Sequence, residues 1–71
     1  MWIFENNAAI NTDQCLSIGT NGTEVTFLLV GVPKVLSVEC GSEDRAAFMF
    51  KDIISELGKG TPIFNVERRL K

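Results

Sequence analysis

The sequence predicts an α+β domain: a mostly antiparallel sheet of four to five strands with one amphipathic helix packed on one face. Asn21-Gly22, between two runs of alternating apolar residues, predicts a hairpin. Residues 42–57 repeat apolar side chains at helical spacing. A chain of 71 residues is one small domain, 1–71, that buries only about 60% of its unfolded surface. We therefore expect a small core that gains from association.

The first predicted element is a short strand at Trp2-Ile3-Phe4, in which Trp2 and Phe4 share a face. Residues 5–7 are typical of a turn, and residues 8–11 are expected to pair back on the strand. Residues 12–14 then form a loop into the central strands.

Two turns define the predicted central strands. Asn21 and Gly22 both tolerate the positive φ of a type I′ turn, which pairs Ile18 with Val25. A four-residue loop at 31–34 then pairs Val25 with Cys40. Both registers place the same side chains on one inner face, namely Leu16, Ile18, Val25, Phe27, Leu29, Leu36, Val38 and Cys40.

The predicted helix begins after Ser42, whose hydroxyl can cap it, and ends before Gly58. Phe48 falls on its charged face, three residues from both Arg45 and Lys51. The face expected to cover the sheet carries Ala46, Ala47, Phe50, Ile53, Ile54 and Leu57.

The last residues admit two interpretations. Residues 63–66 are strand formers and favour an edge strand. Alternatively, Thr61-Pro62 caps a second short helix with Ile63, Val66 and Leu70 inward. Residues 67–71 are expected to be a flexible basic tail.

Composition argues against several functions. Histidine and tyrosine are absent, which removes the commonest general base and metal ligand and the phenol acids. We expect no catalytic residues, cofactor or metal, and hence no enzyme. The net charge of −2 argues against nucleic acid, although Arg68, Arg69 and Lys71 form a basic tip. No apolar run is long enough for a membrane span and no signal pattern is present, so we expect no membrane partner and a cytoplasmic location.

Cysteines and carboxylates offer little chemistry. On the predicted register Cys40 points inward, as a small hydrophobe, and Cys15 points outward, which argues against a disulfide between them. Nothing near Cys15 in the sequence activates its thiol. Glu39, Glu43 and Asp44 form a carboxylate cluster that we interpret as a solvated strand end and helix start.

The outer face of the predicted sheet is polar at one end, with Ser17, Thr26 and Glu39. At its other end it carries the apolar side chains Cys15, Leu28, Val30 and Val35. Either these side chains form an interface with a second copy or a protein partner, or the N-terminal segment or residues 63–66 cover them. Phe48 is a further, auxiliary interface candidate.

The order of elements resembles that of small bacterial and phage- or plasmid-encoded proteins of unknown function. The resemblance is carried by Trp2-Ile3-Phe4, Ile10-Asn11-Thr12-Asp13, the Asn21-Gly22 hairpin and the helix at 42–57. It implies a β-meander and one packing helix, and no catalytic residue.

These observations predict a non-enzymatic protein-interaction module that self-associates. The alternative is a nucleic-acid-binding accessory protein that uses Arg68, Arg69 and Lys71. A third interpretation, a small enzyme, would need its catalytic groups from Cys15 or the Glu39 cluster.

Overall fold

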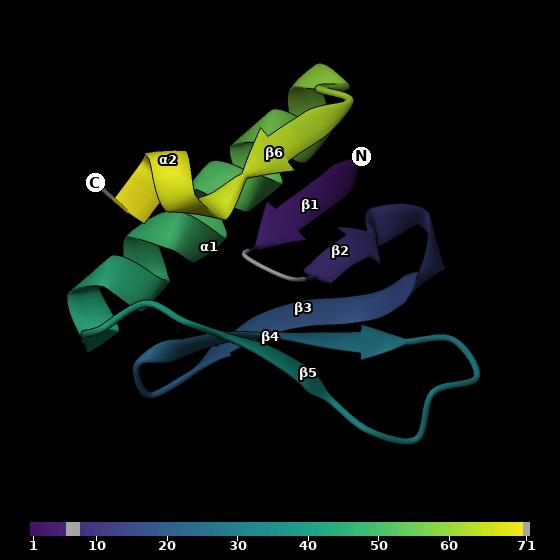
Figure 1. Cartoon of the computed structure of the whole chain (residues 1–71), viewed down its shortest axis with the longest axis horizontal. Helices are drawn as coiled ribbons and strands as arrows, with labels where there is room; N and C mark the ends of the chain where they lie inside the picture. The colour runs from purple at the N-terminus through teal and green to yellow at the C-terminus, as the bar shows by residue number, and fades with distance from the viewer. Residues whose placement is uncertain (6–7, 71) are drawn as a thin grey trace.

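The computed structural model, which describes residues 1–5 and 8–70, confirms the α+β class but divides the strands between two sheets of three (Figure 1). Sheet A has the order β2-β1-β6, with bounds Trp2–Glu5 (β1), Ala8–Asn11 (β2) and Ile63–Asn65 (β6). Sheet B has the order β3-β4-β5, with bounds Cys15–Asn21 (β3), Glu24–Leu29 (β4) and Leu36–Glu39 (β5). The helices are α1 (Glu43–Lys59) and α2 (Val66–Leu70).

Sheet A joins the two ends of the chain. β2 folds back antiparallel on β1, as predicted, whereas β6 runs parallel to β1. The backbone N–H of Trp2 donates to the carbonyl of Pro62 at 2.8 Å, and both the N–H and the hydroxyl of Thr12 donate to the carbonyl of Met1. The expected turn at residues 5–7 falls mostly outside the described residues. The expected loop after β2 is a 3-10 turn, Thr12–Gln14, that turns the chain toward sheet B.

Sheet B is the predicted meander with both registers displaced by two residues. Ile18 pairs with Phe27 instead of Val25, and Val25 pairs with Val38 instead of Cys40. Gly22 and Thr23 are the central turn residues, and Gly22 has φ +60°. Because side chains alternate with period two, a displacement of two leaves each residue on its predicted face. Val25, Phe27, Val38 and Cys40 are accordingly buried.

A β-bulge between Cys15 and Ser17 breaks this alternation at the start of β3. The extra residue turns Leu16 outward, where it is 67% exposed, and Cys15 packs against the core instead. The predicted orientations of Leu16 and Cys15 are therefore both wrong.

Helix α1 begins as predicted, because the Ser42 hydroxyl accepts a hydrogen bond from the N–H of Arg45 at 3.1 Å. It ends two residues later than predicted, at a C-cap on Gly60, which has φ +75°. Its buried face is centred on Ala46, Met49 and Ile53. The predicted inward positions Ala47 and Ile54 are exposed, whereas Phe50 and Leu57 pack against the core.

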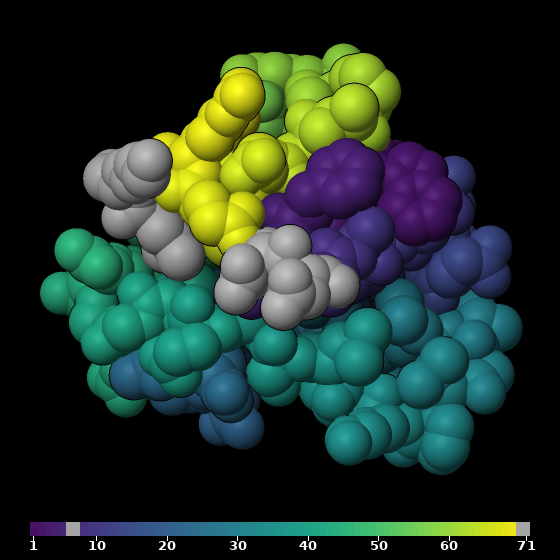
Figure 2. All heavy atoms as spheres, in the orientation of Figure 1, coloured from purple at the N-terminus to yellow at the C-terminus, as the bar shows by residue number. Residues whose placement is uncertain are grey.

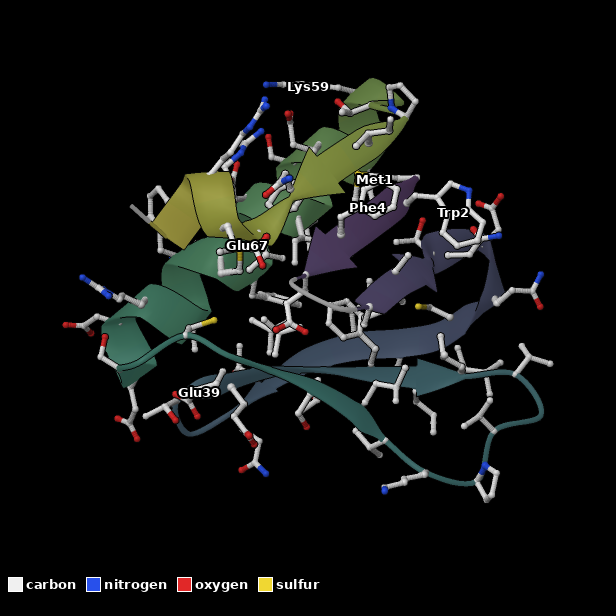
Figure 3. The ribbon with its side chains drawn as sticks, viewed as in Figure 1. Met1, Trp2, Phe4, Glu39, Lys59 and Glu67 are labelled. Carbon is white, nitrogen blue, oxygen red and sulfur yellow. The ribbon has the colours of Figure 1, made fainter. Side chains whose placement is uncertain are left out.

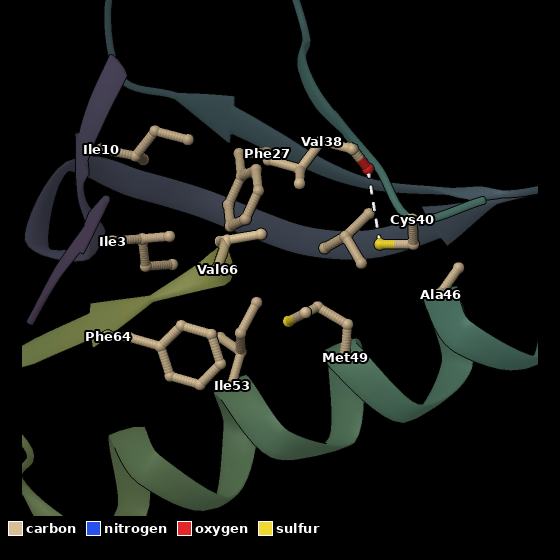
Figure 4. Packing of buried hydrophobic residues seen from close by; sticks show 11 residues of the cluster. Ile3, Ile10, Phe27, Val38, Cys40, Ala46, Met49, Ile53, Phe64 and Val66 are labelled. Atoms are coloured by element: carbon tan, nitrogen blue, oxygen red, sulfur yellow. Dashed lines mark hydrogen bonds between the residues drawn. The ribbon is translucent and has the colours of Figure 1, made fainter. Parts of the chain in front are cut away.

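One hydrophobic core joins these elements (Figure 4). Its members are Ile3, Ile10 and Phe64 from sheet A, Val66 after β6, Val25, Phe27 and Val38 from sheet B, Cys40 after β5, and Ala46, Met49 and Ile53 from α1. Helix α1 lies across β3 and β4, and sheet A closes the side of the core that the meander leaves open (Figures 1 and 4).

The final segment combines the two interpretations of the sequence. Residues 63–65 are an edge strand, as favoured, and the chain then enters the short helix α2 at Val66. Residues 67–70 thus continue a helix, in place of the expected flexible tail, and Lys71 lies outside the described residues.

Candidate interaction surfaces

The outer face of sheet A, which we call the aromatic face, is an apolar surface with no charged residue. The strand pleat directs Ile3, Ile10 and Phe64 into the core, so their neighbours point outward. The six outward positions are Trp2, Phe4, Ala9, Asn11, Ile63 and Asn65.

Register brings the large side chains of this face together. Trp2 lies beside Ile63 on β6, and Phe4 lies between Ala9 and Asn65. Trp2 is 46%, Phe4 40% and Ile63 57% exposed. Figure 2 shows purple side chains from the N-terminal part of the chain on the visible surface, and Figure 3 labels Trp2 and Phe4 on β1.

The two asparagines of the aromatic face are engaged locally. The Asn11 side-chain oxygen accepts a hydrogen bond from the N–H of Asp13 at 3.0 Å, and that of Asn65 accepts one from the N–H of Arg68 at 3.3 Å. The apolar centre is thus bordered by neutral polar groups that already have hydrogen bonds.

A second apolar surface, the valine loop, consists of Val30, Val32 and Val35 between β4 and β5. All three are at least 38% exposed, and Lys34 lies among them in the sequence. The exposed Leu16 belongs to the same end of sheet B, because β3 there pairs with the end of β4.

The structure therefore changes the predicted sheet interface. Leu28 does point outward, opposite Ser17, but it is half-buried. Val30 and Val35 lie in the loop, beyond the strands. The outer face of sheet B carries Ser17, Gly19, Asn21, Glu24, Thr26, Leu28, Ser37 and Glu39, among which only Leu28 is apolar.

The third surface is the helix face of α1, with Phe48 and Ile54. Phe48 is 67% exposed, as predicted, and Ile54 is 45% exposed. Lys51 lies three residues from each and separates them with a charge. The Arg45 guanidinium lies near Gly41: its Nη1 is 3.7 Å from the position that a Cβ on Gly41 would occupy.

The basic residues of the C-terminus are not equivalent. Arg69 forms ion pairs with Asp52 at 2.7 Å and Glu56 at 3.1 Å, and its Cζ lies 4.7 Å from the centroid of the Phe64 ring. These contacts tie α2 to α1 and β6. The hydrogen bonds from Arg69, then those from Lys59, hold the pKa of Glu56 below its usual value. Of the three nucleic-acid candidates, Arg69 is thus paired with carboxylates and Arg68 is exposed.

Both cysteines lie where burial disfavours the thiolate. Both are free, and burial raises the pKa of each, which disfavours the reactive thiolate. Cys40 is buried, as predicted, and its thiol donates to the carbonyl of Val38 at 3.6 Å.

The Glu39 carboxylate serves the turn before α1. It accepts hydrogen bonds from the N–H of Gly41 at 2.8 Å and the hydroxyl of Thr23 at 3.0 Å, which lower its pKa. Within residues 1–5 and 8–70, no cluster of three or more acidic, cysteine or histidine side chains is arranged to hold a metal ion.

Comparison with known proteins found no family model, no curated protein and no solved structure that matches this chain. The resemblance to small bacterial and phage- or plasmid-encoded proteins therefore stays a prediction. In the part of the chain that the structure describes, no helix is both long and apolar enough to cross a membrane.

Sequence reasoning recognised that Trp2 and Phe4 share a face but did not include them among the interface residues. The missing information was the position of β6. Once residues 63–65 pair with β1, Phe64 and Ile3 fill the core side and Ile63 joins Trp2 outside.

Proposed function

We propose that this chain is a non-enzymatic protein-interaction module that associates with copies of itself through exposed apolar side chains. The observation that carries the proposal is that nine large hydrophobic residues in the described part of the chain are more than a third exposed. Six of them gather at the aromatic face and the valine loop, and Leu16 lies at the same end of sheet B as this loop, which favours contact surfaces over singly scattered residues.

The structure does not favour the alternative that another segment of the same chain covers the apolar outer face of the meander. The N-terminal segment and residues 63–66 were the two segments expected to cover the outer face of the meander. Instead they pair with each other in sheet A, and their own outer face adds Trp2, Phe4 and Ile63 to the exposed apolar surface.

The association should be weak. Covering about 300 Å² of apolar surface on each of two copies contributes on the order of 15 kcal/mol at about 25 cal/mol per Å². The loss of translational and rotational freedom opposes this with roughly 4–15 kcal/mol. At most about 11 kcal/mol remains, and the ordering of interface side chains reduces it further, so we expect a dissociation constant in the micromolar range or above.

Sedimentation equilibrium between about 1 μM and about 1 mM tests the proposal, since this range covers such dissociation constants. We expect the average mass to rise with concentration and to be unchanged or increased by salt. A chain that is strictly monomeric over the whole range would refute self-association.

Varying the salt concentration also tests the alternative function, nucleic-acid binding. Binding of a single-stranded oligonucleotide through Arg68 and Lys71 should weaken steeply between about 50 and 200 mM salt. Because Arg69 is paired with Asp52 and Glu56, we expect no such binding. The cytoplasmic location also remains part of the proposal.

A further inference from the structure

We propose that the partner of the aromatic face is the aromatic face of a second copy, in a twofold, sheet-on-sheet contact centred on β1. This inference rests on the proposed self-association and names its surface and symmetry. It places Trp2, Phe4 and Ile63 of each copy in one shared apolar layer.

Charge distinguishes this face from the other two surfaces. None of its six outward positions is charged, so a contact confined to these strands buries no charged side chain. The exposed Asp13, which pairs with the N-terminal ammonium at 4.0 Å, lies beyond the strands, in the 3-10 turn after β2. The valine loop includes Lys34, and Lys51 separates Phe48 from Ile54 on the helix face. A contact between two copies at either surface would therefore place charged side chains in or beside the interface.

The secondary structure also favours a second copy. The aromatic face is one side of a three-stranded sheet, and its opposite side is already packed on the core. Sheets commonly pack face to face about 10 Å apart, with interdigitating side chains. A second copy supplies a sheet of the same width, and a twofold contact is the commonest closed arrangement of identical chains.

The area of the face sets the size of the contact. From their exposed fractions, Trp2, Phe4 and Ile63 together expose on the order of 300 Å². A standard interface buries about 800 Å² per partner, so these side chains are suited to the apolar core of a small interface. Asn11 and Asn65 would lie in its polar rim.

Trp2 makes the contact directly measurable. It is the single tryptophan, and the chain has no tyrosine, so near-ultraviolet-excited emission reports this face alone. In a dimer we expect a blue-shifted emission maximum and about half the acrylamide quenching of the dilute protein, because a 46% exposed side chain becomes covered.

The experiment combines Trp2 quenching with sedimentation for the wild type and three variants. Ile63→Lys places a charge in the face and keeps Trp2 as the reporter, whereas Val35→Lys and Phe48→Lys are matched controls on the other two surfaces. We expect Ile63→Lys to abolish dimerisation and the protection of Trp2, and both controls to retain them. Ile63→Thr, a strand former, replaces Ile63→Lys if circular dichroism shows that the lysine variant is unfolded.

The outcomes separate this inference from the broader proposal. A wild type that associates while Trp2 stays fully accessible, or an Ile63→Lys variant that associates normally, overturns the aromatic-face contact and leaves self-association standing. A mass that rises beyond twice that of one chain overturns the twofold symmetry. A strictly monomeric wild type overturns both proposals.

Discussion

The side chain of Arg69 attaches the short helix α2 to α1 and β6. Its guanidinium bridges Asp52 and Glu56, which lie one helical turn apart on α1, and covers the buried Phe64 ring. Without it, two carboxylates would face each other at i,i+4 spacing, which destabilises a helix. Arg69 therefore removes a repulsion in α1 and also holds α2 in place.

We predict that Arg69→Leu lowers the thermal unfolding midpoint by about 5 °C, an effect at the upper end of those of partly exposed ion pairs. Arg68→Leu is the matched control, because it removes the same charge from an exposed neighbour in the same helix. Equal midpoints for the two variants would contradict this role for Arg69.

The ion pair between Arg69 and Glu56 also predicts how the stability of the folded chain changes with pH. The pKa of Glu56 is lower in the folded chain than in the unfolded chain, chiefly because Arg69 donates a hydrogen bond to it. Its contribution to stability is therefore present above the unfolded pKa of about 4.3 and is lost as the pH falls through the folded value. In urea titrations at about pH 6 and about pH 3, Arg69→Leu should lose less stability on acidification than the wild type.

At the scale of elements, the two glycines near the end of α1 differ in the backbone conformation that they adopt. Gly58 lies within the helix at an ordinary φ, and a Cβ there would meet no heavy atom within 4 Å. Gly60 is the C-cap at φ +75°, and its N–H donates to the carbonyl of Leu57 at 3.1 Å. Only Gly60 needs the left-handed conformation.

We predict that Gly60→Ala costs about 1 kcal/mol in free energy of unfolding, because alanine is strained in the left-handed region. Gly58→Ala should instead stabilise the chain by up to about 1 kcal/mol, because alanine favours the helix and restricts the unfolded chain. Chemical denaturation of both variants measures this difference, and a loss of stability in Gly58→Ala would contradict it.

Local sequence pattern predicted those elements of the fold whose formation depends on local residues. Turn residues and alternation identified the meander, and the two-residue displacement of each register left its faces unchanged. The bulge at Leu16 has no comparable local signal, so the predicted orientations there were wrong. The pairing of β6 with β1 depends on packing between opposite ends of the chain, which spacing alone does not specify.

The candidate surfaces also divide into one that local pattern predicts and one that depends on packing between distant segments. Phe48 could be identified as exposed from helical periodicity alone, and its 67% exposure confirms this. The aromatic face could not be assigned, because alternation shows that Trp2 and Phe4 share a face but not which face is buried. Phe64 decides that question: on β6 it packs beside Ile3 and leaves the other side of β1 open.

For the molecule as a whole, the division into two sheets does not create two folding units. Residues from both sheets and from α1 form a single buried cluster, and neither three-stranded sheet has a core of its own. A chain of this length has a total stability of roughly 4–10 kcal/mol. Loss of either sheet would expose the residues on which the other sheet packs.

We therefore predict one cooperative unfolding transition in dilute protein. Trp2 fluorescence reports sheet A, and far-ultraviolet circular dichroism is dominated by α1, so their urea midpoints should coincide. Ile53→Val, a change in α1 at a 1% exposed position, should lower both midpoints together, at a cost of about 0.5–1.5 kcal/mol. Ser55→Ala, on the exposed side of the same helix, should move neither midpoint downward. A Trp2 transition that precedes the helix transition, or that Ile53→Val leaves unmoved, would mean that sheet A opens independently of the core.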